Sequence, residues 1–512
     1  MSNIRSAKDI LSALDGGKTD ADLIMKAYEV ADKSHKGQTR YSGEPYLTHV
    51  AEVAYALADI GMDAKTVAAG LLHDTLEDGD VNPEYIQKEF GVEVYQLVDG
   101  VTKLGTLRYR GTSRHTEALR KLFAATAHDI RVLIIKLMDR LHNAKTLEHV
   151  PKEKRKRIAL ETLEIYAPIA DRLGMGIVKR ELEDAAFPYA NPAEHKEVLN
   201  LLKERSMETQ KRLEKAEKTL KKILAQERIR KFRTESRVKG IYSLYQKLER
   251  KDWDITKIHD IMALRIILPI IADCYTVLGL IHSQWRPVPG KIKDYIASPK
   301  LNGYQSIHTT VFTGDGGTLE LQVRTEAMHR EARLGIASHL SYKEMIGYPE
   351  GRKGGGLAWL RQFFPRIGTE PVGGMSKEIG MTHLYKASNV PNWIKELAEI
   401  SQSDDEGKDM KNIASDFFTY RVFTFTPQND VIDLPLNATP IDFAYAVHSD
   451  IGNHISGAKV NGKLVSLDTP LKNGDIVEII TKQSSKPTQK WMKIAKTTLA
   501  KKHIRAALKE RA

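Results

Sequence analysis

Residues 129–147 read DIRVLIIKLMDRLHNAKTL, and their apolar side chains recur with the 3.6-residue period of an α-helix. The predicted helix is apolar on most of its faces, which indicates that it is buried. Asp139 lies within it, where an unpaired carboxylate would cost several kcal/mol. A metal ion or a cation must therefore satisfy Asp139, and Asn143, one turn further on, would face the same place.

The sequence on either side of this stretch also predicts helices. Between residues 20 and 190 one helical pattern follows another, and nothing alternates like a strand. The clearest patterns, besides residues 129–147, lie at Leu23–Lys33, Val50–Ile60 and Lys65–Leu76. We therefore expect an all-α domain in the N-terminal part of the chain.

Four residues of the predicted helical domain are of types that bind metals: His49, the doublet His73-Asp74, and Asp139. Imidazole and carboxylate groups together suit a divalent ion such as Mn²⁺. The alternative is that the doublet is incidental, that His49 is a core histidine and that Asp139 pairs with Arg140. Four such residues on three helices favour the metal site.

Two acidic residues, Glu77 and Asp78, follow the doublet. His73 and Glu77 are four positions apart, as are Asp74 and Asp78, so on one helix each pair would share a face. The acidic pair would then lie beside the metal, where it can handle the protons of an attacking water and of a leaving group.

Length and composition restrict the class of protein. The 512 residues predict roughly three or four domains, and 41% hydrophobic with 28% charged residues excludes collagen-like, mucin-like and wholly disordered chains. No apolar run is long enough for a membrane span, and the first residues lack the apolar core of a signal peptide. Cys274 is the only cysteine, which excludes an intramolecular disulfide and favours the reducing cytoplasm.

The charge is positive and uneven. Lys and Arg number 78 against 66 Asp and Glu, a net charge of +12. From residue 482 to the end there is one acidic residue, Glu510, among many lysines and arginines. Such a tail is typical of contact with nucleic acid, although a solvated helix face is the alternative.

Changes in composition predict six segments. The helical domain occupies 1–195, and a charged stretch with spaced leucines at 196–235 is most simply a helical connector. A mixed α/β domain follows at 236–345, and then a Gly-rich linker with short helices at 346–415. A small β-rich module with a turn signal at Asn461-Gly462 occupies 416–482, and a basic helical tail occupies 483–512.

The α/β domain shows strand patterns at Asp260–Leu268, His308–Thr313 and Leu319–Thr325, and we expect helices at 240–250, 273–283 and 326–344. Alternation along residues 319–325 places Glu320, Gln322 and Arg324 on one face of a strand.

Two acidic residues on neighbouring strands of this domain, Asp260 and Glu320, suit phosphoryl chemistry: one can hold Mg²⁺ and the other can take a hydroxyl proton. The cations expected around them suit the binding of a triphosphate. The alternative to a catalytic site is a solvated strand among scattered surface lysines. No GxxxxGK[ST] motif is present, and Tyr304 is a candidate for base stacking. The cations are Arg237, Lys239, Lys247, Lys291, Lys293 and Lys300.

HDTLED (73–78), with RYSGEPYLTH (40–49) and IKLMDRLHNAKTL (135–147), resembles the hydrolase domain of the RelA/SpoT family. This resemblance implies that Mn²⁺ binds to the four ligand-type residues, that Glu77 and Asp78 handle protons, and that Arg40 and Asn143 hold the nucleotide. The implied ligands are His49, His73, Asp74 and Asp139.

SRVKGIYSLYQK (236–247), HDIMALRII (259–267), GKIKDYIASPKLNGYQSIHTT (290–310) and LELQVRT resemble the synthetase domain of the same family. The family transfers the β,γ-diphosphate of ATP to the 3′-hydroxyl of GDP or GTP, making (p)ppGpp. The resemblance implies that Asp260 binds Mg²⁺ and that Glu320 binds it too or acts as the base. It places Arg237, Lys239 and Lys247 at ATP, and it places Lys293, Lys300, Asn302, Tyr304 and His308 at GDP or GTP, with Lys291, Gln322 and Arg324 in support.

Residues 416–482, with TPIDFAYAVHSDIGNHISGAKVNGKLV, resemble a TGS domain, a small β-grasp fold. The resemblance implies contact with uncharged tRNA through His448; the alternative is a histidine packed under the sheet. The basic tail could meet RNA phosphates, and the ribosome is a further expected partner. We expect the cysteine-rich and ACT-type domains of the longest family members to be absent.

The resemblance therefore implies a multidomain α and α+β protein, with an all-α HD hydrolase domain, a mixed α/β nucleotidyltransferase-like synthetase domain and a β-grasp TGS domain. Its implied function is bifunctional: synthesis and hydrolysis of (p)ppGpp in the stringent response. The alternatives are a hydrolase with a weak or tRNA-dependent synthetase, and a tRNA-binding nucleotide sensor. We expect the connector at 196–235 to couple the two sites, so that one opens as the other closes.

Overall fold

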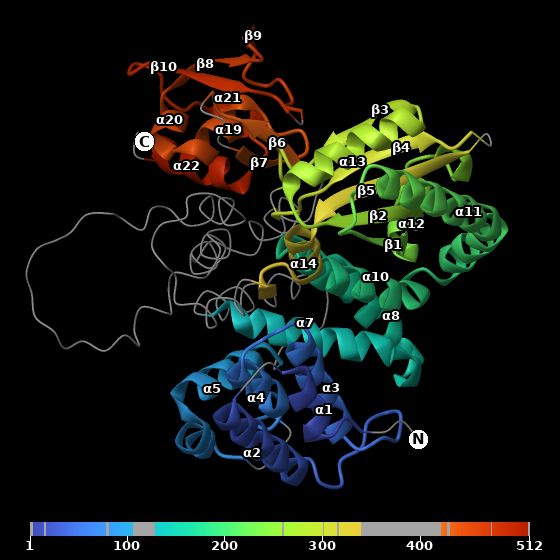
Figure 1. The fold of residues 1–512 in the computed structure, drawn as a ribbon. Coiled ribbons are helices and arrows are strands. Elements are labelled where there is room, and N and C mark those ends of the chain that lie inside the picture. Colours follow the sequence, from blue (N-terminus) through green and yellow to red (C-terminus); the bar gives the residue numbers. More distant parts are fainter. Residues whose placement is uncertain are drawn as a thin grey trace, which may run out of the picture. The chain divides into compact units, whose positions relative to one another are not determined.

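The computed structural model describes residues 4–14, 17–77, 81–105, 129–258, 261–300, 302–314, 317–338, 421–427, 431–472 and 474–509. The predicted linker lies outside these residues, as do two predicted site residues, Asp78 and Asp260. The described residues form two compact units, residues 4–338 and residues 421–509 (Figure 1).

The N-terminal part of the first unit is helical, as predicted. Its buried centre is α7, the helix of the quoted segment, which contacts α3, α4, α5 and α10. Leu133, Ile134, Ile135 and Leu137 of α7 are fully buried. The helices are α1 (Ala7–Ala13), α2 (Lys18–Ser34), α3 (Leu47–Asp59), α4 (Ala64–Leu72), α5 (Pro83–Gly105) and α7 (Ile130–Lys145).

Two aspartates begin helices α4 and α7 and share one cation. Asp63 is the N-cap of α4 and accepts a hydrogen bond from the backbone N–H of Thr66, and Asp129 does the same for α7 through Arg131. The Arg131 guanidinium also forms ion pairs with Asp63, Asp129 and Glu93. Capping thus fixes where α4 and α7 begin, and Arg131 ties both starts to α5.

The prediction that residues 65–76 form one helix is wrong at its C-terminal end. Helix α4 ends at Leu72, and residues 73–77 form turns. The Thr75 hydroxyl donates to the Leu72 carbonyl, and the His73 ring lies 2.8 Å from the Gly70 carbonyl oxygen. These local side-chain bonds compete with the helical pattern, so the doublet and Glu77 do not share a helix face.

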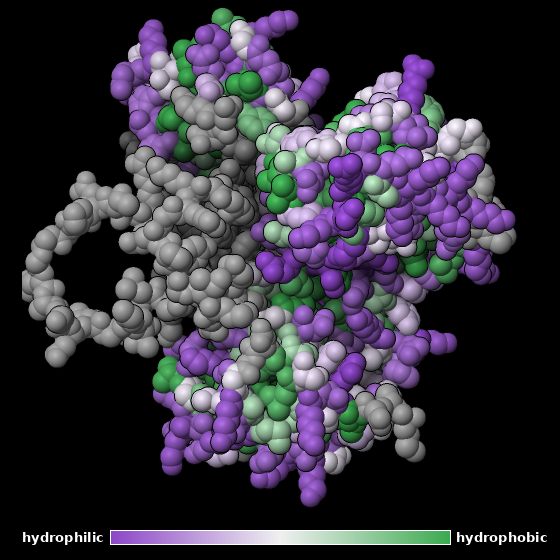
Figure 2. Space-filling model, in the orientation of Figure 1, coloured by the Kyte–Doolittle hydropathy of each residue, from purple (hydrophilic) through white to green (hydrophobic). Residues whose placement is uncertain are grey.

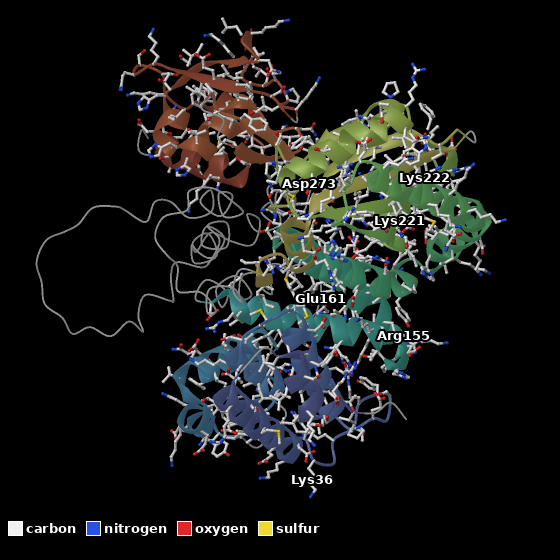
Figure 3. The ribbon with its side chains drawn as sticks, viewed as in Figure 1. Lys36, Arg155, Glu161, Lys221, Lys222 and Asp273 are labelled. Carbon is white, nitrogen blue, oxygen red and sulfur yellow. The ribbon has the colours of Figure 1, made fainter. Side chains whose placement is uncertain are left out.

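A further run of helices follows α7. It comprises a 3₁₀ turn (Leu147–His149), α8 (Lys152–Glu161), a π-helical turn (Thr162–Tyr166), α9 (Ala167–Arg172) and α10 (Gly176–Ala190). Arg140 of α7 donates to Glu161 at the end of α8, which is labelled in Figure 3, and its guanidinium lies 4.3 Å from the centre of the Tyr166 ring. Arg140 is therefore engaged by α8 and the π-helical turn, and the alternative that it pairs with Asp139 is wrong.

The rest of the first unit is built on a mixed five-stranded sheet of order β1-β2-β5-β4-β3. Strands β2 and β5 are parallel, and the other neighbours are antiparallel. The three predicted strands correspond to β2, β4 and β5. Strands β1 and β3 were not predicted. The elements are β1 (Arg233–Val238), α12 (Ile241–Glu249), a 3₁₀ turn (Ile255–Lys257), β2 (Met262–Leu268), α13 (Ile271–Gln284), β3 (Pro287–Asp294), β4 (Ile307–Phe312), β5 (Thr318–Thr325) and α14 (Glu326–Leu334).

One long helix, α11 (Pro192–Gln226), covers most of the predicted connector. Leu213, Leu220 and Leu224 are buried in the same cluster as the apolar face of the sheet. The exposed side of α11 is charged, with Lys221 paired to Glu217 one turn back (Figure 3). The predicted connector is thus built into the core of the α/β domain.

Helix α10 joins the helical part to the α/β part. The Ser243 hydroxyl of α12 donates to Glu183 of α10, and the backbone N–H of Tyr242 donates to Asp184. The Glu183 side chain is buried, which raises the pKa of its carboxyl to about 7, although Lys179 nearby favours the charged form. A carboxyl group that gains a charge near neutral pH therefore lies at this contact.

We expect Glu183→Gln to become relatively more stable as the pH rises. A carboxyl whose pKa is raised on folding contributes stability that is complete below its unfolded pKa and is lost as pH rises through the folded value. Between about pH 6 and about pH 8.5, the unfolding free energy of the variant minus that of wild type should increase by about 1 kcal/mol. Calorimetry at both pH values checks this, with Glu181→Gln, partly exposed on the same helix, as control. A difference independent of pH would contradict it.

The second unit contains β6 (Arg421–Phe425) and β7 (Val431–Pro435), paired with each other, and a three-stranded sheet of order β10-β8-β9. As predicted, a tight turn joins β8 to β9, with φ of 52° at Asn461 and 78° at Gly462. The remaining elements are α19 (Pro440–Val447), α20 (Ser449–Asn453), β8 (Ile455–Val460), β9 (Lys463–Val465), β10 (Val477–Thr481), α21 (Gln489–Ile494) and α22 (Thr498–Lys509).

The basic tail packs against this β-rich module. Trp491, Ala500 and Ile504 share an apolar cluster with Ile441 and Tyr445 of α19. One oxygen of the buried Asp442 accepts hydrogen bonds from the backbone N–H groups of Lys496 and Thr497. Helices α21 and α22 are therefore part of the same folded unit as α19.

The surface agrees with the charged composition. Hydrophilic side chains cover most of the visible face of the α/β part in Figure 2. Among the helices in the described part of the chain, none combines the length and the apolar character that crossing a membrane would require.

Candidate functional site

Two histidines and an aspartate meet in the helical part of the first unit. His49 comes from the start of α3, and His73 and Asp74 directly follow α4. One ligand atom from each lies within 4.8 Å of the other two. Both imidazoles are buried and Asp74 is partly exposed, so the group can accept a metal ion that is still reachable from solvent.

The orientation of His73 fits a metal ligand. Its Nδ1 lies 2.8 Å from the Gly70 carbonyl oxygen, which can only accept, so Nδ1 carries the proton. Nε2 lies 3.2 Å from an Asp74 oxygen but has no hydrogen-bond partner among the described residues. Because Gly70 engages Nδ1, Nε2 is the ring nitrogen that faces Asp74, and a divalent ion could take the place of a proton there.

The fourth predicted ligand, Asp139, lies beside this group, with Oδ1 3.3 Å from His49 Nε2. Its other oxygen forms an ion pair of 2.7 Å with Lys136, and the Asn143 amide donates to Oδ1 at 2.5 Å. Burial alone would raise the pKa of Asp139, but Lys136 and the histidines hold it well below the usual range. Asp139 is therefore a carboxylate that is available to a cation.

Arg40 and Asn143, the two residues expected to hold the hydrolase nucleotide, contact each other. Nη2 of Arg40 donates to Oδ1 of Asn143 at 2.6 Å, and Nη1 lies 2.7 Å from Nδ1 of His142. That histidine nitrogen in turn lies 2.9 Å from Nδ1 of His49. A chain of polar contacts thus runs from Arg40 to the metal-binding group.

The charges of the group are strongly perturbed. Burial lowers the pKa of His49 and, with His49 and Arg40 close by, lowers that of His142 to about 3. Burial also disfavours the charged form of His73, but the attraction of Asp74 outweighs it and raises the His73 pKa to about 9. The Asp74 pKa falls below its usual range, against the effect of burial, because of His73. The site therefore attracts positive charge, whether a proton or a metal ion.

Sequence reasoning missed three side chains here. Lys136 pairs with Asp139, His142 contacts His49, and the Tyr46 hydroxyl donates to Asp74 at 2.8 Å. All three lie inside the segments quoted for the hydrolase resemblance. Their residue types could therefore be read from the sequence, but their contacts could not. Glu77 is exposed in the turn after α4.

The second constellation lies on one face of the five-stranded sheet. Glu320, only 9% exposed, accepts a hydrogen bond of 2.8 Å from Gln322, and its Oε1 lies 3.0 Å from Nδ1 of His308 on β4. Nε2 of His308 lies 2.8 Å from the Tyr304 hydroxyl. The alternation predicted for β5 is confirmed, because Leu319, Leu321 and Val323 are buried in the opposite, apolar cluster. These contacts position a carboxylate for accepting a proton.

The predicted cations lie on the elements around this carboxylate. The Lys300 ammonium lies 4.8 Å from the centre of the Tyr295 ring and 5.0 Å from that of Tyr304, and burial lowers its pKa. Lys293 pairs in register with His308, and Arg237 lies on the same face at the other edge of the sheet. Lys247 lies in α12, Lys239 directly after β1 and Lys291 in β3. An anionic ligand would offset this excess of positive charge.

Asn302 has partners on both sides. Its Oδ1 accepts from the backbone N–H of Tyr304, and its Nδ2 donates to the backbone oxygen of Asp171 in α9 at 3.1 Å. The loop expected to hold the guanine nucleotide is therefore attached to the helical part. This contact is outside the predicted connector.

A charged cluster at the β1 end of the face contains the predicted residue Arg324, but its other members, Glu235, Arg265 and His329, were missed. Arg265 donates to Glu235 at 3.0 Å, and Nη2 of the buried Arg324 lies 3.0 Å from Nδ1 of His329. Burial lowers the pKa of Arg324 to about 10. Glu235 and Arg265 lie opposite each other on β1 and β2, a pairing that depends on the unpredicted strand β1.

His448, the predicted tRNA contact, lies in the second unit at the junction of α19 and α20. Its side chain is exposed, and its Nδ1 accepts from the backbone N–H of Asp450. The alternative of a histidine packed under the sheet is therefore wrong.

Three segments match known families. Residues 27–176 match the HD domain, residues 236–346 match the region found in RelA/SpoT proteins, and residues 421–481 match the TGS domain. A small alarmone synthetase of Bacillus subtilis is 33% identical over 29% of this chain and 85% of its own, with a TM-score of 0.23.

Long relatives match nearly the whole chain. The guanosine-3′,5′-bis(diphosphate) 3′-pyrophosphohydrolase of Aquifex aeolicus is 43% identical over 96% of this chain. The GTP pyrophosphokinase of Myxococcus xanthus is 42% identical over 96%, and the bifunctional (p)ppGpp synthase/hydrolase RelA of Mycobacterium tuberculosis is 41% identical over 95%. The chain spans 65%, 61% and 62% of the lengths of these relatives. With its HD, RelA/SpoT and TGS domains in this order, the chain belongs to the RelA/SpoT family.

Proposed function

We propose that this protein both makes and degrades (p)ppGpp. It would transfer pyrophosphate from ATP to the 3′-hydroxyl of GDP or GTP, and it would hydrolyse (p)ppGpp to GDP or GTP and pyrophosphate. The observation that carries the proposal is that one unit contains both polar constellations, with the His73 nitrogen lacking a hydrogen-bond partner among the described residues and Glu320 held by His308 and Gln322. The names of the long relatives cover both activities.

In the hydrolase half, His49, His73, Asp74 and Asp139 would hold Mn²⁺, since mixed imidazole and carboxylate ligands suit that ion. A bound divalent ion would activate water and offset phosphate charge. Arg40 would hold the nucleotide phosphates, because a guanidinium suits phosphate oxygens and this one lies beside Asn143, in contact with the same group of residues. Glu77 and Asp78 are proposed to transfer the protons.

In the synthetase half, the 3′-hydroxyl of GDP or GTP would attack the β-phosphorus of ATP, the bond to the α-phosphate would break, and AMP would leave. Glu320 would take the hydroxyl proton, and Asp260 would hold Mg²⁺. Arg237, Lys239 and Lys247 would bind ATP, and the loop from Lys293 to His308 would bind the guanine nucleotide.

The second unit would contact RNA. We propose uncharged tRNA as its partner because His448 is exposed at the junction of α19 and α20, two helices that contact the basic helix α22. The place of action would be the cytoplasm, where ATP, GTP and tRNA are available. Ribosome binding is a further expectation of the same surface.

A single time course tests the enzymatic proposal. The chain is incubated with ATP labelled at the γ-phosphate, excess GDP, Mg²⁺ and Mn²⁺, and the products are separated by thin-layer chromatography. We expect label to enter ppGpp and then to appear in free pyrophosphate. If label stays in ATP, ppGpp is added directly: cleavage would leave a hydrolase with a silent or tRNA-dependent synthetase, and its absence would favour a nucleotide sensor.

A further inference from the structure

His142 has no role in the function proposed above, yet it lies between two residues that do. It is on α7, three positions after Asp139. Its Nδ1 is 2.7 Å from Nη1 of Arg40 and 2.9 Å from Nδ1 of His49. One ring nitrogen therefore approaches a nucleotide-binding residue and a metal ligand at the same time.

The chemistry of these partners fixes where the protons are. A guanidinium can only donate, so Nδ1 of His142 must accept from Arg40 and carries a lone pair. Nδ1 of His49 approaches the same lone pair, and a second lone pair at 2.9 Å would be repelled. A proton on Nδ1 of His49, donated to His142, satisfies this contact.

A proton on Nδ1 leaves the lone pair of neutral His49 on Nε2. Nε2 is the atom that faces the carboxylates, 3.3 Å from Asp139 and 3.6 Å from Asp74. These oxygens attract a proton to Nε2, which would block a metal ion there. A hydrogen-bond acceptor next to Nδ1, on the opposite side of the His49 ring, is needed to favour the tautomer with the proton on Nδ1.

We infer that His142 is a positioning residue that selects the Nδ1–H tautomer of His49 and so keeps Nε2 available to a divalent metal ion. The inference rests on the metal site of the proposed hydrolase. His73 needs no such residue, because the Gly70 backbone oxygen accepts its Nδ1 proton. His142 and Asn143 also link Arg40 to the metal group through two neighbouring side chains of α7.

The matched variants are His142→Asn and His142→Leu in the full chain. Asparagine and leucine branch alike, but only asparagine offers an oxygen near the position of Nδ1. Mn²⁺ affinity is measured from the electron paramagnetic resonance signal of the free ion. We expect binding about 10- to 100-fold weaker for His142→Leu and within a few-fold of wild type for His142→Asn.

A second measurement reports the tautomer without metal or substrate. In ¹⁵N spectra of metal-free protein, we expect His49 as the Nδ1–H tautomer in wild type and His142→Asn, and a shift toward Nε2–H in His142→Leu. An Nε2–H tautomer in wild type, or equal losses of Mn²⁺ affinity in both variants, would overturn the inference. So would unchanged affinity in His142→Leu. A wild type that binds Mn²⁺ but fails to cleave ppGpp would instead contradict the proposed hydrolase and leave this inference standing.

Discussion

Glu320→Gln should reduce pyrophosphate transfer from ATP to GDP by about 10²- to 10⁴-fold and leave ppGpp cleavage within a few-fold of wild type. The side chain keeps its shape, so its contacts with Gln322 and His308 can be replaced by similar ones. What is lost is the negative charge and the ability to take the hydroxyl proton. Initial rates with labelled ATP, and separately with ppGpp, measure both activities in the same preparation.

The matched control is Glu326→Gln, at the first residue of α14, directly after strand β5. Glu326 is exposed at the start of that helix and forms its ion pair with Arg233. We expect it to retain most of the transfer rate. If both variants lost transfer equally, the loss of any negative charge in this region would explain the effect. The proposed role of Glu320 as the proton acceptor would then be wrong.

Asp74→Asn should abolish ppGpp cleavage, with a loss of about 10²-fold or more, and should weaken Mn²⁺ binding by a similar factor. Asp74 is close to Nε2 of both histidines, and Tyr46 donates to it. An amide preserves the size of the side chain but removes the charge that draws a cation to the site. In the one-tube assay, the variant should accumulate ppGpp without releasing pyrophosphate.

Asp59→Asn is the control for this change, since Asp59 ends α3 and is exposed in the same part of the chain. It should cleave ppGpp and bind Mn²⁺ as wild type does. Full cleavage by Asp74→Asn at saturating Mn²⁺ would show that the group formed with His49 and His73 is not the hydrolytic centre.

The buried helix α7 illustrates what the sequence could predict. A helix that is apolar on most faces and carries one aspartate needs a cation beside it, and Asp139 indeed has both Lys136 and the histidines. The sequence left open which cation pairs with it. Lys136 and Arg140 are both one turn or less from Asp139, so either could pair with it. Only the packing decides between them, because α8 and the π-helical turn engage Arg140.

Strands β1 and β3 show why parts of the fold were not predictable. Both lie at the edges of the sheet, so each has only one strand neighbour. β3 is largely exposed and contains Pro and Gly, and β1 is rich in charges, so neither carries the apolar alternation by which strands are recognised. The pairing of Glu235 with Arg265 follows from β1 and was missed with it.

The His73-Asp74 doublet shows the opposite situation. The residue types alone indicated the site, although the helix expected to hold it ends at Leu72. His73 keeps its direction because the Gly70 carbonyl oxygen fixes its ring, not because a helix continues through Glu77. Which residue types come together was thus easier to predict than the backbone that presents them.

The buried carboxylate of Asp442 determines how short a separately expressed fragment of the second unit can be. One of its oxygens accepts from Lys496 and Thr497, far along the chain, while the other accepts from Thr439 at the start of α19. A fragment cut after β10 would leave this charge buried with half of its donors missing, a loss that commonly costs several kcal/mol. The shortest piece expected to fold by itself therefore extends through α22, and fragments for tRNA-binding measurements should include residue 509.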